Sequence, residues 1–130
     1  MILVDSSVWI DYFGGRPTAQ TDQLDHLLDS EELAIGDLVL TEVLQGCKLD
    51  RQFNEVRRLL SRLEFVVLGG QDVAVAAARN YRTLRSLGVT VRGTVDVVLA
   101  TRCIVNDFQL LHSDRDFDPF ERHLGLRCVA

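Results

Sequence analysis

The stretch MILVDSSVWID, residues 1–11, decides the fold because a short apolar run leads directly into a polar turn and then a helix. Residues 2–4 (ILV) are continuously apolar, which is typical of a strand covered on both faces of a parallel sheet. Asp5, Ser6 and Ser7 end the run, and a helical stretch starts near Val8. A strand covered on both faces needs helices on both sides of its sheet, so this opening predicts a layered α/β fold with a central first strand.

The rest of the chain alternates between short apolar strands and helical stretches, with no hairpin signal between strands. Further strands are predicted at residues 33–35, 65–68, 110–112 and 126–129, and helices at residues 8–13, 21–28, 38–46, 51–63, 71–87, 95–107 and 119–124. Thr94 is predicted to cap the helix at 95–107, and Asp118, before Pro119 and Glu121, to cap the last one. We therefore predict one domain, residues 1–130, that forms a three-layer α/β/α sandwich with a mostly parallel sheet.

The composition is that of a globular protein with a hydrophobic core: 130 residues, of which 47% are hydrophobic and 25% charged. No apolar stretch approaches membrane-spanning length and no basic leader precedes one, so we expect a cytoplasmic protein without membrane contact. Cys47, Cys103 and Cys128 are scattered and form no CxxC pair. They are predicted to be small buried hydrophobic residues rather than disulfide partners or zinc ligands.

Charge is unevenly distributed along the chain, although its sum of −5 argues against a general nucleic-acid binder. Residues 1–47 hold nine acids and one basic residue, Arg16. Residues 71–102 hold two acids and five arginines, namely Arg79, Arg82, Arg85, Arg92 and Arg102. One small domain could therefore hold a cation and a polyanion side by side. The arginines are candidate phosphate contacts, although each alone could equally lie on a solvated helix face.

Acidic residues follow two of the predicted strands, and others lie near the ends of predicted helices. Asp5 and Asp114 come directly after strands, whose carboxyl ends share one edge of a parallel sheet. Asp5 could instead cap a helix, Glu42 could be a solvated residue at the edge of its apolar helix, and Asp96 could be an ordinary first-turn acid. Taken together at one edge, such carboxylates suit Mg²⁺ or Mn²⁺.

Four motifs of this sequence resemble the PIN domain, and specifically the VapC toxin ribonucleases of VapBC toxin–antitoxin pairs. They are ILVDSSVWID at 2–11, LTEVLQG at 40–46, RGTVDVVLA at 92–100 and LLHSDRDF at 110–117, and they occur in the order found in that family. The resemblance implies that Asp5, Glu42, Asp96 and Asp114 bind Mg²⁺ or Mn²⁺ as the catalytic acids, with Asp116 as an auxiliary ligand. It also implies that the hydroxyl of Ser6 or Ser7 orients a ligand or a water.

The same resemblance implies an activity and partners. The expected activity is a metal-dependent endoribonuclease, the toxin of a type II pair, whose water-driven cleavage leaves a 5′-phosphate and a 3′-hydroxyl. The expected partners are RNA, with Arg79, Arg82, Arg85 and Arg92 as contacts, and a VapB-like antitoxin. That antitoxin would lie in an apolar groove near the first helices, where Trp9 and Phe13 are available, and the toxin would be a homodimer within the complex.

Other interpretations of the sequence stay open at this point. A metal-dependent adhesion module would need a fuller Asp-x-Ser-x-Ser pattern than Asp5 to Trp9 supplies, and a receiver domain would need a late lysine, whereas the chain has only Lys48. A folded relative that binds RNA or an antitoxin without cleaving is a third alternative. A metal-free ribonuclease would use histidine, and only His112 lies near the acids; we interpret it as a structural residue at a strand end.

Overall fold

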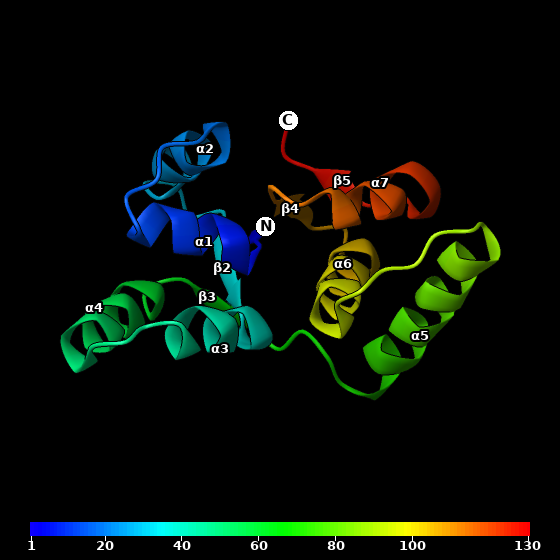
Figure 1. The fold of residues 1–130 in the computed structure, drawn as a ribbon, viewed down its shortest axis with the longest axis horizontal. Coiled ribbons are helices and arrows are strands. Elements are labelled where there is room, and N and C mark those ends of the chain that lie inside the picture. The colour runs from blue at the N-terminus through cyan, green and yellow to red at the C-terminus, as the bar shows by residue number, and fades with distance from the viewer.

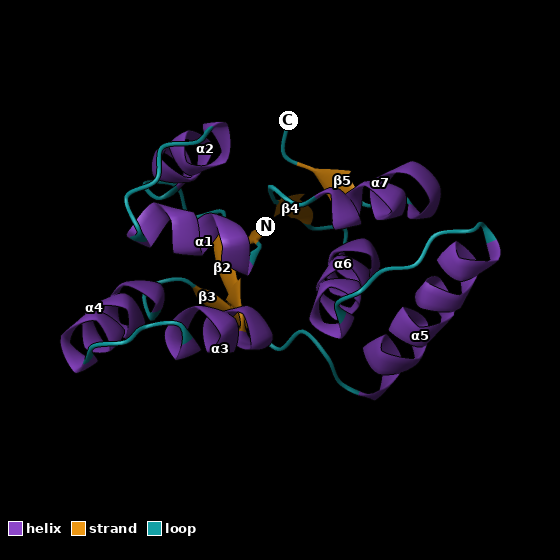
Figure 2. Ribbon diagram, in the orientation of Figure 1, coloured by secondary structure: helices purple, strands orange, loops and turns teal.

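The computed structural model describes residues 1–130 and contains one parallel five-stranded sheet between helices (Figures 1 and 2). The strands are β1 (Ile2–Val4), β2 (Leu33–Gly36), β3 (Glu64–Val66), β4 (Gln109–Leu111) and β5 (Arg127–Cys128). The helices are α1 (Ser6–Phe13), α2 (Ala19–Leu27), α3 (Asp37–Gln45), α4 (Asp50–Leu60), α5 (Gln71–Ser86), α6 (Thr94–Asn106), the 3₁₀ turn η1 (Arg115–Phe117) and α7 (Asp118–Leu124). Helices α1 and α2 lie on one side of the sheet and α5 and α6 on the other (Figure 1). The predicted α/β/α sandwich is confirmed.

The strand order β3-β2-β1-β4-β5 places β1 in the middle of the sheet, as the opening residues predict. All neighbouring strands are parallel, and Ile2 is paired with Leu33 on one side and with Gln109 on the other. The chain builds outward from β1 to β3 and then returns to the opposite side for β4 and β5. The switch point of the sheet therefore lies beyond the carboxyl ends of β1 and β4, where such folds bind ligands.

A core of buried hydrophobic side chains fixes the edge of the sheet at which Asp5 follows β1 and Asp114 follows β4. Trp9, Phe117 and Phe120 are its largest fully buried side chains. Burying a side chain of this size stabilises the fold by about 2 kcal/mol. Phe117 ends the short turn that follows β4, so its burial holds that turn against the sheet. Burial of all three residues of β1 confirms the strand covered on both faces.

Two predicted helix caps are wrong. Thr94 is the first residue of α6, and Gly93, with an extended backbone, occupies the N-cap position. Asp118 is the first residue of α7 and makes no side-chain cap hydrogen bond, because η1 runs directly into this helix. The cap lies one turn earlier, where the Asp114 carboxylate accepts a hydrogen bond of 2.9 Å from the Asp116 N–H.

The third strand is also displaced from its prediction at residues 65–68, since β3 covers Glu64–Val66. Leu68 instead leaves the sheet and is buried against Gly36, where a Cβ would lie 2.6 Å from the Leu68 side chain. The Leu68 N–H donates to Asp37 Oδ1 at 3.0 Å, which ties this segment to the start of α3. Of the cysteines, Cys103 is buried as predicted, whereas Cys47 and Cys128 are only half-buried. No helix combines the length and apolar character that crossing a membrane requires.

Candidate active site

Asp5 lies at the carboxyl end of β1, and its position is fixed by both neighbouring elements. Its N–H donates to the carbonyl of Leu111 at 2.9 Å, which extends the pairing of β1 with β4. The residue is only 4% exposed, and its Oδ2 accepts a hydrogen bond of 2.6 Å from the Ser7 hydroxyl. It occupies the N-cap position of α1 but makes no side-chain cap hydrogen bond, so capping does not explain it. Burial raises the pKa of Asp5, and the Ser7 hydroxyl partly offsets this.

Asp96 projects from the first turn of α6 into a strongly negative environment. Burial raises the pKa of its carboxyl to about 7, and the neighbouring carboxylates of Asp5, Asp114, Glu42 and Asp116 add to the effect in that order. An ordinary first-turn acid has its charge favoured by the helix dipole, so the raised pKa argues against that interpretation. Gly93 lies beside it, because a Cβ there would come within 3.1 Å of Asp96 Oδ2.

Glu42 reaches the same region from α3. Its Oε1 is buried and has no hydrogen-bond partner. Burial raises the pKa of Glu42, the nearby Ser6 hydroxyl opposes the change, and the negative charge of Asp5 adds to it. A buried carboxylate oxygen without a partner is costly unless something else satisfies it. This side chain is therefore not the solvated helix-edge glutamate that its position in the sequence allows.

Asp114 and Asp116 complete the group from the turn after β4. One carboxylate oxygen each of Asp96, Asp114 and Asp116 lie within 4.8 Å of one another. The hydroxyls of Ser7 and Ser113 are 3.3 Å apart and connect the turns that follow β1 and β4. The structure thus brings together the side chains that the sequence singles out from four separate segments.

The five acids of this cluster, Asp5, Glu42, Asp96, Asp114 and Asp116, have no basic partner. The ion pairs of the protein involve other acids, namely Asp11, Glu55 and Asp107. An oxygen-only donor set with an orphaned buried oxygen, in which the pKa values of Asp5, Glu42 and Asp96 are raised, fits a hard divalent cation such as Mg²⁺ or Mn²⁺. Asp118, two residues after Asp116, is exposed and is not among the charges that act on Asp96, so it stands apart from the cluster.

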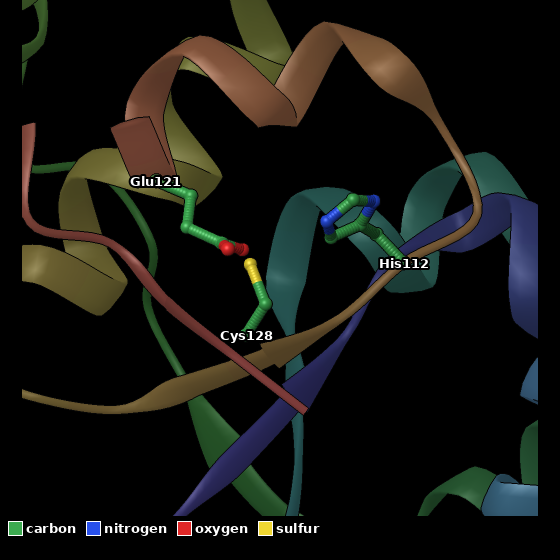
Figure 3. A group of neighbouring side chains, drawn as sticks. All are labelled: His112, Glu121 and Cys128. Atoms are coloured by element: carbon green, nitrogen blue, oxygen red, sulfur yellow. The ribbon is translucent and has the colours of Figure 1, made fainter. Parts of the chain in front are cut away.

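A second group of side chains, His112, Glu121 and Cys128, differs from the acid cluster because it offers nitrogen, oxygen and sulfur atoms. Figure 3 shows Glu121 and Cys128 side by side with the ring of His112 facing them, and one ligand atom of each lies within 4.8 Å of the others. Burial and the neighbouring Glu121 raise the pKa of the Cys128 thiol to about 12.

His112 of this group stabilises the turn that follows β4 rather than taking part in catalysis. Its Nδ1 accepts a hydrogen bond of 3.3 Å from the Asp114 N–H, and its ring packs against Phe117 with centroids 4.9 Å apart. Both contacts support the interpretation of His112 as a structural residue at a strand end.

The arginines of the sequence separate into two groups. Arg79, Arg82, Arg85 and Arg92 are exposed and make no ion pair. The first three line a polar hollow of about 700 Å³ on α5 together with Thr83 and Ser86. Arg102 instead donates to the carbonyls of Leu68 and Gly69 at 3.1 and 2.7 Å, so it holds the β3–α5 connection and is not a free phosphate contact.

An apolar cavity of about 230 Å³ lies between α1 and the end of α4. It is lined by Trp9, Tyr12, Phe13, Leu28, Leu59, Leu60, Arg62 and Leu63. Trp9 and Phe13 stack with centroids 5.8 Å apart, and Trp9 Nε1 is buried without a partner. Sequence reasoning found Trp9 and Phe13 but missed the wall from α4. The amphipathic pattern of α4 predicts that its apolar residues are in the core, yet Phe53 and Leu59 remain exposed.

The comparisons with known proteins find similar proteins over most or all of the chain. The model of the PIN domain family matches residues 2–122. Ribonuclease VapC11 of Mycobacterium tuberculosis is 30% identical over 132 residues, which cover all of this chain and 98% of that protein. Among solved structures, DNA-bound VapBC from Salmonella typhimurium has a TM-score of 0.77 at 20% identity, over 98% of this chain and 96% of that one. The sarcin-ricin loop cleaving toxin VapC20 of Mycobacterium tuberculosis has a TM-score of 0.65 at 19% identity, over 91% and 93%.

Proposed function

Because the chain belongs to the PIN domain family, we propose that it is a metal-dependent endoribonuclease and the toxin of a type II toxin–antitoxin pair. The observation that carries this proposal is the cluster of five acids without a basic partner at the switch point of the sheet. The full-length similarity to a VapC ribonuclease supports RNA as the substrate.

The cluster would hold Mg²⁺ or Mn²⁺ through Asp5, Glu42, Asp96 and Asp114, with Asp116 as an auxiliary ligand. When bound, such an ion supplies Lewis-acid activation of water and neutralises charge on the scissile phosphate. Asp96 must be ionised to take part, and its raised pKa means that protons compete with the cation near neutral pH. Cation binding should therefore strengthen as the pH rises through about 7 and level off once Asp96 is ionised.

The chain's own groups orient the reactants. The Ser7 hydroxyl fixes one oxygen of Asp5, and the Asp116 N–H fixes one oxygen of Asp114. Glu42 Oε1 has no protein donor, so it is available as a ligand for the cation. Since water rather than the ribose 2′-hydroxyl is the nucleophile in this account, the products carry a 5′-phosphate and a 3′-hydroxyl.

A VapB-like antitoxin is the proposed protein partner, with the toxin as a homodimer inside the complex. The apolar cavity at Trp9, Tyr12 and Phe13 is the surface that would receive an apolar segment of this partner. Exposed Leu59 at the end of α4 extends the same surface. The structural similarity to VapBC, a two-protein assembly, supports this assignment.

The experiment that tests the proposed function compares RNA cleavage by the unmodified protein, by Asp96→Asn and by Asp118→Asn, with Mn²⁺ or with EDTA. Cleavage should require the metal and be lost in Asp96→Asn. The control Asp118→Asn removes an exposed acid that lies two residues after Asp116 and should retain activity. Normal cleavage by Asp96→Asn would show that the acid cluster does not carry the reaction. No cleavage by the unmodified protein with Mn²⁺ would support the alternative that the fold only binds RNA or an antitoxin.

A further inference from the structure

A cleft of about 480 Å³ lies between α5 and the first turns of α6, outside the acid cluster. Ala74, Ala77 and Ala78 of α5 form one wall, and Val91, Val97 and Val98 form the other. The alanines leave the space open, because larger side chains at these positions would fill it. The cleft has the size and apolar lining of a site for a small flat molecule.

Positive charge lies at the edge of this cleft. Arg82 and Arg92 are among its lining residues, and neither makes an ion pair. Arg82 also lines the hollow that contains Arg79 and Arg85, so the cleft opens onto an unpartnered basic surface. Tyr81 adds an aromatic ring to the lining, with the Arg85 guanidinium 5.6 Å above that ring. An apolar slot beside free guanidinium groups is complementary to a nucleotide, which has a flat base and an anionic phosphate.

The cleft and the acid cluster share one turn of α6. Thr94 and Val98 line the cleft, whereas Asp96, between them in sequence, belongs to the acids. At 3.6 residues per turn, Asp96 projects to the opposite side of the helix from Thr94 and Val98. The first turns of α6 therefore contribute side chains to both sites, which lie on different faces of one helix.

We infer that the cleft between α5 and α6 receives an unpaired nucleobase next to the phosphodiester bound at the acids. This inference rests on the proposed ribonuclease function and adds a specificity element to it. A base in a duplex cannot enter, because both of its faces are stacked and its pairing edge is occupied. The substrate must thus be single-stranded at the cut, and the mainly apolar walls select the base by shape and stacking more than by hydrogen bonds.

The test uses Ala78→Leu, which fills the cleft from an exposed position of α5, and Val75→Leu as a control on the same helix outside the cleft. Both are made in the Asp96→Asn protein, so that binding is measured without cleavage. The probe is a labelled single-stranded RNA of about 12 nucleotides that contains the mapped cleavage site. A second set of probes carries one abasic position each, and binding is followed by fluorescence anisotropy with Mg²⁺.

Ala78→Leu should weaken binding of the intact RNA about tenfold, the usual scale of losing one stacked base, while Val75→Leu should not. One abasic probe should bind about tenfold more weakly, and Ala78→Leu should then cause no further loss. Equal affinity of every probe and variant, in a protein that cleaves RNA, would overturn the inference and leave the proposed function standing. A homodimer that Ala78→Leu dissociates would overturn it too, because a second copy would then cover the cleft. Absence of cleavage with any RNA would refute the proposed function and the inference resting on it.

Discussion

Replacing Asp96 by asparagine should make the metal-free protein more stable while it abolishes activity. The pKa of this carboxyl is raised from its ordinary 3.8 to about 7, so the folded state resists its ionisation. If the whole pKa shift acted on stability, it would lower the free energy of unfolding by about 4 kcal/mol once the carboxyl is ionised. Asp96 is only half-buried and solvent screens its neighbours, which reduces the expected gain to about 2 kcal/mol. For a chain of this length that gain raises Tm by about 8 °C.

The sign of the effect depends on pH. Below pH 3.8 the carboxyl is protonated in both the folded and the unfolded chain and does not affect stability. As the pH rises from 3.8 to about 7, the unfolded chain loses its proton first, so the native state becomes progressively less stable. Above that range the loss is complete, and the advantage of Asp96→Asn is greatest.

Urea denaturation in EDTA at pH 4 and pH 8 measures this difference. Asp72→Asn is the matched control, because Asp72 is an exposed acid in the first turn of α5. Its removal should destabilise the protein by about 0.5 kcal/mol through the helix dipole. If Asp96→Asn is destabilising at pH 8 in the same way, Asp96 is an ordinary first-turn acid and the argument for a strained acid cluster is wrong.

Three further predictions concern metal binding, packing at Gly36 and the arginines of α5. Mn²⁺ at 100 times its Kd should stabilise the unmodified protein by about 2.7 kcal/mol, measured as a rise in Tm; an equal rise in Asp96→Asn would place the ion elsewhere. Gly36→Ala should cost about 2 kcal/mol in urea denaturation, because its Cβ would lie 2.6 Å from the buried Leu68 side chain; unchanged stability would show that Leu68 moves freely. Reversing the charges of Arg79, Arg82 and Arg85 together should reduce the slope of log K against log salt for RNA by at least about 2, and an unchanged slope would remove this surface from the RNA site.

Much of the fold can be predicted from the sequence, because its strands are short apolar runs and the polar residues that follow end each strand. Residues 2–4 need two covered faces wherever they lie, and this requirement alone indicates a central strand. The helix caps were less predictable, because they depend on the backbone just before each helix. Gly93 displaces Thr94 from the cap position, and the 3₁₀ turn before Asp118 removes the need for a cap there.

The acid cluster was predictable for a different reason. Asp5 and Asp114 follow strands that share one sheet edge, whereas Glu42 and Asp96 were indicated mainly by the family resemblance. No local pattern reports that Glu42 Oε1 lacks a partner or that the alanines of α5 line an open cleft. Both are long-range properties, since they arise from segments that meet only in the folded protein. The same holds for the wall that α4 adds to the cavity at Trp9.

Mapping the ends of RNA fragments produced by the purified protein tests the proposed metal-dependent cleavage. Cleavage should occur only with Mg²⁺ or Mn²⁺, at unpaired positions, with a 5′-phosphate on one fragment and a 3′-hydroxyl on the other. Cleavage that persists in EDTA, or that leaves a 2′,3′-cyclic phosphate, would contradict it.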